Sequence, residues 1–158
     1  MNLFEDFFSR KLQYTQGSPI KVGSVGQDLY FRKTSLEGFS KQVEGKFIPY
    51  TFFKDWENQF LKIENFDPHV LLIYRPEVFP KDFLVKLREK YITVGYFTEP
   101  LPFGEYENHP DLISRFEFIK NFDFSLCNYF IVYNSITTKR IFDLCDPILD
   151  RKSTRLNS

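Results

Sequence analysis

The sequence predicts an α/β protein with a Rossmann-like, doubly wound, mainly parallel sheet of about five strands and helices on both faces. Continuous apolar runs bounded by polar or turn residues indicate strands that are buried on both sides, as a parallel sheet covered by helices requires. Amphipathic segments of helical length separate these runs, which is typical of βαβ units with right-handed crossovers. The clearest three runs span residues 69–74, 92–97 and 129–134.

Two earlier runs complete the predicted sheet. Residues 20–25, IKVGSV, read as the first strand, and residues 46–50, KFIPY, as a weaker second strand. The internal Pro49 weakens the second assignment because proline donates no hydrogen bond to a sheet.

The segment 79–91 has the clearest helical pattern. Phe79, Phe83, Leu87 and Tyr91 recur at steps of four, the charged residues face away, and Pro80 suits the first helical turn. The same reasoning predicts further helices over residues 2–14, 51–66, 109–122 and 135–145. The first of these is amphipathic and poor in Lys and Arg, so we expect it to dock on the domain or on a partner rather than on a membrane surface.

The length of 158 residues allows about one domain, which we place at residues 1–149. Residues 150–158, DRKSTRLNS, are polar and unpatterned, and they resemble the translation of a common sequencing-library adapter. We therefore treat them as a non-native tail. The natural reading frame would then be cut at Leu149, and we expect residues 1–149 to be the front of a longer protein.

Net charge and the length of apolar runs indicate which partners and which cellular compartment to expect. The 21 basic and 21 acidic residues cancel, and without the tail 18 basic and 20 acidic residues leave a net charge of −2, a poor footprint for nucleic acid. No apolar run is long enough for a transmembrane segment, and the start lacks the order of a secretory signal, so we expect a cytoplasmic protein. Cys127 and Cys145 have no metal-type spacing and are predicted to be reduced packing residues.

Ligands of doubly wound sheets bind beyond the carboxyl ends of the strands, so the residues there are candidates. After the first strand, Ser24 and Gly26 either let a ligand approach or form a plain turn. The segment VGSVGQD is neither G-x-G-x-x-G nor a Walker A loop, so NAD binding and ATP hydrolysis are not supported.

The ends of the third and fourth strands carry charged residues. Arg75 either binds a phosphate or carboxylate of a ligand or pairs with Glu77 or Glu99. Thr98 and Glu99 begin a proline-stiffened loop, in which Glu99 is either a general base towards a hydroxyl or a solvated carboxylate.

The remaining candidates are Asn134 and Ser135 after the fifth strand and His109, a loop residue within reach of the cleft. His69 precedes an apolar strand and is predicted to serve in packing or capping. No metal motif and no Ser-His-Asp arrangement is present, so we predict neither a metal site nor a bound cofactor.

Residues 70–103, VLLIYRPEVFPKDFLVKLREKYITVGYFTEPLPF, resemble the N-terminal half of the CgeB-like, spore-maturation-type glycosyltransferases. The shared features are an apolar strand ending in an Arg-Pro-Glu-like segment, a helix rich in Leu and Arg, and a strand running into a Thr-Asp-Pro-type loop. Residues 122–144 also resemble the strand, polar loop and helix that follow in the family. This sequence has Glu99 where an aspartate is usual.

The resemblance implies one half of a two-domain GT-B glycosyltransferase that transfers sugar from a nucleotide-sugar donor without a metal. The N-terminal half would hold the acceptor, a glycan, protein or small molecule, and would be inactive without the donor-binding half. Glu99, then His109, would assist the acceptor hydroxyl. The alternative is a non-catalytic flavodoxin-like or receiver-like binding module, although Gly-Ser-Val-Gly and Arg-Pro-Glu replace the acidic residues of a receiver.

Overall fold

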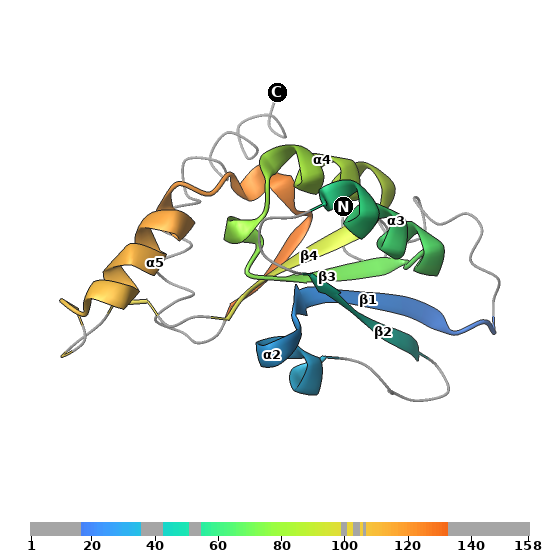
Figure 1. Ribbon diagram of the computed structural model, residues 1–158, viewed down its shortest axis with the longest axis horizontal. Helices are drawn as coiled ribbons and strands as arrows, with labels where there is room; N and C mark the ends of the chain where they lie inside the picture. Colours follow the sequence, from blue (N-terminus) through green and yellow to red (C-terminus); the bar gives the residue numbers. More distant parts are fainter. Residues whose placement is uncertain are drawn as a thin grey trace, which may run out of the picture.

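A computed structural model describes residues 17–35, 43–50, 55–98, 101–102, 105 and 107–132 of the chain. Within them, five strands form one sheet in the order β2-β1-β3-β4-β5, and every neighbouring pair is parallel (Figure 1). The strands are β1 (Ile20–Gln27), β2 (Val43–Tyr50), β3 (Val70–Tyr74), β4 (Ile92–Phe97) and β5 (Tyr129–Val132).

Helices and short 3-10 turns connect these strands. The helices are α2 (Asp28–Phe31), α3 (Trp56–Phe66), α4 (Lys81–Lys90) and α5 (Pro110–Lys120). The 3-10 turns are η1 (Arg32–Thr34), η2 (Pro76–Val78) and η4 (Phe124–Leu126).

Helices lie on both faces of the sheet, with α3 and α4 on one side and α2 on the other (Figure 1). The side chains of β3 contact both helical layers, because successive side chains of a strand point to opposite faces of the sheet. Leu71 and Ile73 pack in the cluster that contains the residues of α3 and α4, whereas Leu72 and Tyr74 pack with Phe31 of α2. The predicted Rossmann-like α/β fold is confirmed.

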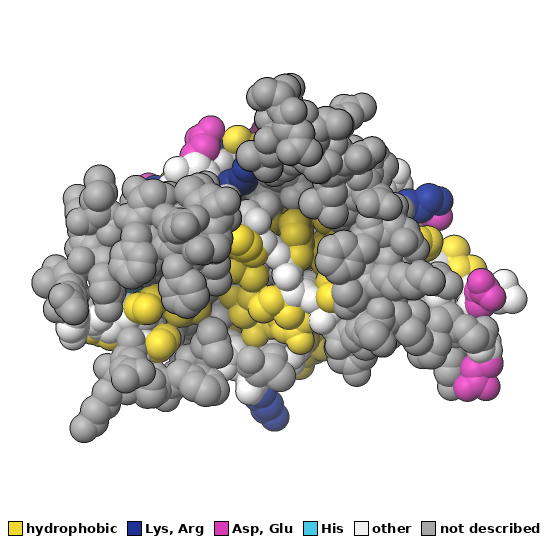
Figure 2. All heavy atoms as spheres, turned by 180° about the vertical axis from the view of Figure 1, so that it is seen from behind, with side chains coloured by type: hydrophobic (Ala, Val, Ile, Leu, Met, Phe, Trp, Pro, Cys, Tyr) yellow, Lys and Arg dark blue, Asp and Glu magenta, His cyan; other side chains and the backbone are white. Residues whose placement is uncertain are grey.

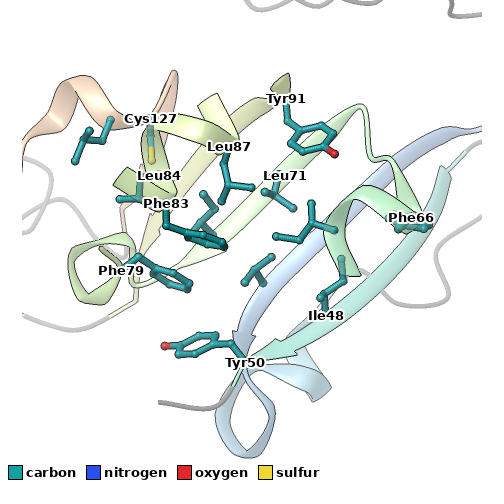
Figure 3. Packing of buried hydrophobic residues seen from close by; sticks show 14 residues of the cluster. Ile48, Tyr50, Phe66, Leu71, Phe79, Phe83, Leu84, Leu87, Tyr91 and Cys127 are labelled. Carbon is teal, nitrogen blue, oxygen red and sulfur yellow. The ribbon is translucent and has the colours of Figure 1, made fainter. Parts of the chain in front are cut away.

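The largest hydrophobic cluster lies between the sheet and the layer of α3 and α4 (Figure 3). Leu84 and Leu87 of α4 are fully buried there, Leu87 as the helical spacing predicted, and burial of each contributes about 1.5–3 kcal/mol. Phe79 and Tyr91 are also buried but flank the helix instead of belonging to it. A second cluster joins Ile119 of α5 to the end of β4.

Several element bounds differ from the sequence prediction. β2 begins at Val43 and includes Pro49, which an edge strand tolerates because one side of its backbone has no partner strand in the described sheet. β1 continues to Gln27. The four-residue α2 was not predicted because it covers only about one turn, too little for an apolar pattern to repeat. Pro80 is the N-cap of α4 and not a residue of its first turn.

Other predictions concern residues that the structure does not describe. These are the helices over 2–14 and 135–145, the start of the helix over 51–66, residues 133–134 of the last strand, and the tail at 150–158. Cys127 is a buried free thiol, as predicted, and Cys145 lies outside the described residues.

Candidate functional site

The strand order reverses at β1, because the chain passes from β1 to β2 on one side and returns to β3 on the other. In open α/β sheets such a switch point, at the carboxyl edge, is where ligands bind. Here β1 ends at Gln27, β2 at Tyr50 and β3 at Tyr74, and these ends lie at one edge of the parallel sheet. This edge is therefore the candidate site.

The chain turns sharply after β3. Arg75 has a left-handed backbone with φ 56°, a conformation that costs a non-glycine residue on the order of 1–2 kcal/mol. Its N–H donates to the carbonyl of Tyr96 in β4 at 2.9 Å, and its own carbonyl accepts from the N–H of Val78 at 3.2 Å. The sheet thus holds a strained residue in place, and such residues concentrate at functional sites.

Arg75 and Glu77 form an ion pair across this turn. The Arg75 Nε donates to Oε1 of Glu77 at 3.1 Å, and the two side chains are only 19% and 2% exposed. Of the alternatives that the sequence left open for Arg75, the pairing with Glu77 is therefore present. The pair places a charged group at the switch point that is largely removed from water.

Tyr50, at the end of β2, belongs to the same environment, and sequence reasoning missed it. The residue is 6% exposed, and its ring centroid lies 4.7 Å from that of Phe79. Burial raises the pKa of Tyr50 to about 12, with the cation of Arg75 lowering that pKa and the carboxylate of Glu77 raising it. Its place as the last residue of a weak strand at the carboxyl edge was the only sequence signal.

Ser24 and Gly26 lie on the other face of the sheet, towards α2. Ser24 is 1% exposed and pairs in register with Phe47 and Leu72, which belong to the cluster around Phe31. A Cβ at Gly26 would lie 2.9 Å from the Phe31 ring and 3.1 Å from that of Tyr74. The space next to Gly26 is thus filled by the rings of Phe31 and Tyr74, where the sequence had suggested that a ligand could approach.

Thr98 follows β4 and is partly buried. Its Oγ1 is buried, with no hydrogen-bond partner in the described part of the chain. Buried polar atoms are normally paired, so this hydroxyl is a candidate ligand contact. Glu99, Asn134 and Ser135 lie outside the described residues, and their predicted roles stay predictions.

The two histidines occupy different places. His109 is exposed and is the N-cap residue of α5, without a side-chain hydrogen bond to the helix. His69 lies at the opposite, amino edge of the sheet, where its Nδ1 accepts the N–H of Lys21 at 2.8 Å. Of the two roles predicted for His69, packing or capping, the structure shows a side-chain hydrogen bond to the backbone at the start of the sheet.

A cavity of about 690 Å³ opens beside Glu77. It lies between η2, the start of α4, α5 and the segment around η4. Its lining combines carboxylates, aromatic rings, one lysine and an amide; the residues are Glu77, Phe79, Lys81, Ser114, Glu117, Phe118, Asn121, Phe122, Asp123 and Leu126. The buried ion pair thus borders a cavity of the size that small ligands occupy.

Neither the charges on the visible face nor the described metal-binding side chains point to a second site. On the face shown in Figure 2, hydrophobic side chains gather near the centre, and the described Lys and Arg side chains are scattered without forming a stripe. Among the described residues, no three His, Cys, Asp or Glu side chains are grouped to hold a metal ion. None of the described helices is long and apolar enough to cross a membrane.

Comparison with known proteins assigns no family. No protein-family model matches the chain, and no curated protein matches it at a significant level.

Proposed function

We propose that the chain is the acceptor-side half of a GT-B-type glycosyltransferase. The observation that carries the proposal is the buried Arg75–Glu77 pair in a strained turn at the switch point, directly beside a cavity. The parallel sheet and the resemblance of residues 70–103 to CgeB-like enzymes support the same reading.

In the proposed reaction, an acceptor hydroxyl attacks the anomeric carbon of a nucleotide sugar. The new bond joins the acceptor oxygen to that carbon, while the bond from the carbon to the nucleoside diphosphate breaks. A base removes the acceptor proton, and Glu99 is our first candidate and His109 our second. The Arg75–Glu77 pair would fix the position of Glu77, which holds the acceptor beside the base.

The test uses a clone of the natural gene, which under this proposal continues beyond Leu149. We expect its coding sequence to add a second Rossmann-like half, and its product to release nucleoside diphosphate from a nucleotide sugar only when an acceptor is present. Glu99→Gln should lower the transfer rate by about 10²–10⁴-fold if Glu99 is the base. A stop codon at that point, or no transfer with any nucleotide sugar, would overturn the proposal.

A second candidate is a flavodoxin-like binding module, which the strand order 2-1-3-4-5 favours because flavodoxin-like proteins share it. Flavodoxin itself binds FMN at the switch between the first and third strands. Fluorescence titration of the 158-residue chain with FMN tests the second candidate. Saturable quenching would favour the flavodoxin-like module, and no quenching would reject FMN binding.

A further inference from the structure

We propose, building on the glycosyltransferase function above, that the cavity beside Glu77 binds a hexose unit of the acceptor that is uncharged or carries an amino group. The cavity has a volume of about 690 Å³, within the range of about 300–1,000 Å³ typical of small-molecule sites. Its lining residues determine the class of ligand.

One side of α5, together with its C-cap residue, supplies polar and aromatic side chains to the cavity lining. Ser114, Glu117, Phe118 and Asn121 all line the cavity. Their spacing of three, four and seven residues places them on one side of a helix. Ile119 lies on another side and is fully buried against the end of β4. The helix is thus anchored by Ile119 and places Ser114, Glu117 and Phe118 along the cavity. Asn121 follows as the C-cap residue, and its Nδ2 donates to the backbone carbonyl of Glu117 at 2.8 Å.

Phe118 is the one large exposed hydrophobic side chain among the residues that line the cavity. Its side chain is 58% exposed although it lines the cavity, so a large apolar surface remains in contact with water. The flat C–H face of a pyranose ring can cover such a ring, while the sugar hydroxyls reach the polar groups around it. Ligand sites typically combine an apolar surface with a few placed polar groups in this way.

The charges of the lining select against anionic sugars. Three acidic residues, Glu77, Glu117 and Asp123, line the cavity together with one lysine. Glu77 is paired with Arg75 and Glu117 with Lys120, but neither of these cations is among the residues that line the cavity. That lysine, Lys81, is already engaged, since its Nζ lies 3.1 Å from Oδ2 of Asp123. Carboxylates accept hydrogen bonds from hydroxyl and ammonium groups and repel phosphates and other carboxylates.

The experiment is an NMR titration of the isotope-labelled 158-residue chain with single sugars. The probes are glucose, galactose, N-acetylglucosamine and glucosamine, compared with glucuronic acid and glucose 6-phosphate. We expect shifts that saturate in the millimolar range for at least one of the first four probes, and affinity about tenfold lower or worse for the two anionic sugars, or about 1.4 kcal/mol.

Two variants of α5 make the test specific. Phe118→Ala should weaken sugar binding at least about tenfold. Ile113→Ala removes another exposed apolar side chain from the same helix, outside the cavity lining, and should leave the affinity unchanged. Because both side chains are exposed, both variants should fold, which the spread of their amide shifts will verify.

Three results would overturn the inference: no saturable shift with the four probes up to about 50 mM, equal affinity in Phe118→Ala, or equal affinity for the anionic sugars. The outcome is separate from that of the transfer assay. Transfer without sugar binding in this cavity would reject the inference alone, whereas sugar binding by a protein without transfer would reject the proposed function alone.

Discussion

The Nε of Arg75 lies 3.1 Å from Oε1 of Glu77, and the two residues are joined by Pro76 in a turn that begins with a left-handed backbone. Proline fixes its own φ and so limits the conformations of this turn. The pair therefore does two things at once: it neutralises a carboxylate that is 2% exposed, and it shapes the carboxyl edge beside the cavity.

Removing one partner of this pair should destabilise the protein. Arg75→Met leaves the Glu77 carboxylate buried without its cation, and we expect a loss towards the low end of about 3–5 kcal/mol, because Arg75 itself is partly exposed. Urea unfolding followed by circular dichroism measures it. The double variant Arg75→Met/Glu77→Gln should recover part of the loss; additive losses would show that the two side chains are not coupled.

The absence of a side chain at Gly95 should be required for packing under η2. A Cβ there would lie 2.8 Å from the Phe130 ring and 3.0 Å from Pro76. We expect Gly95→Ala to cost about 1–3 kcal/mol through overpacking. A second substitution, Phe130→Leu, gives the space back and should recover part of the loss in thermal unfolding. No recovery would place the strain at Pro76.

Stability should fall at alkaline pH because of Tyr50. Its pKa in the folded protein is raised from 10.0 to about 12, so the folded state keeps a phenol proton that the unfolded state loses. The stabilisation is present below pH 10 and disappears as the pH rises through about 12. Denaturant unfolding at a series of pH values should show this decline in the wild type and a shallower one in Tyr50→Phe. Parallel curves would contradict the assignment.

The thiol of Cys127 should be inert in the folded protein. It is 4% exposed, and burial raises its pKa to about 12, so it is protonated at pH 8 and unreactive towards disulfide reagents. In a Cys145→Ser variant we expect no reaction with a chromogenic thiol reagent until the protein unfolds. Fast reaction of the folded variant would show that the segment around η4 opens easily.

Most of the sheet could be predicted from local patterns. β3 and β4 have apolar residues on both faces because helices cover both sides, and this gives continuous runs such as VLLIY. α2 was missed because four residues are too few to show a period. β2 was underestimated because the cost of Pro49 depends on whether the strand is at an edge, which no local pattern reveals.

The candidate site was predictable only in part. Arg75 and Glu77 were identified because they interrupt an apolar run at a strand end. Tyr50 was not identified, because it is 25 residues away from Arg75 in the sequence. The charges of Arg75 and Glu77 act on Tyr50 only because the strand order brings the ends of β2 and β3 to the same edge of the sheet. The cavity was also missed, since its walls come from α5 and from the turn after β3.

The sequence by itself determined the class of fold and the residues available at each strand end, because buried strands and amphipathic helices both produce patterns within short stretches of the chain. Only the tertiary structure decided which of those residues share a site. Strand order, the face to which each side chain points and the rotation of α5 arise from packing between distant segments. The left-handed turn at Arg75 is held by the neighbouring strand in the same way.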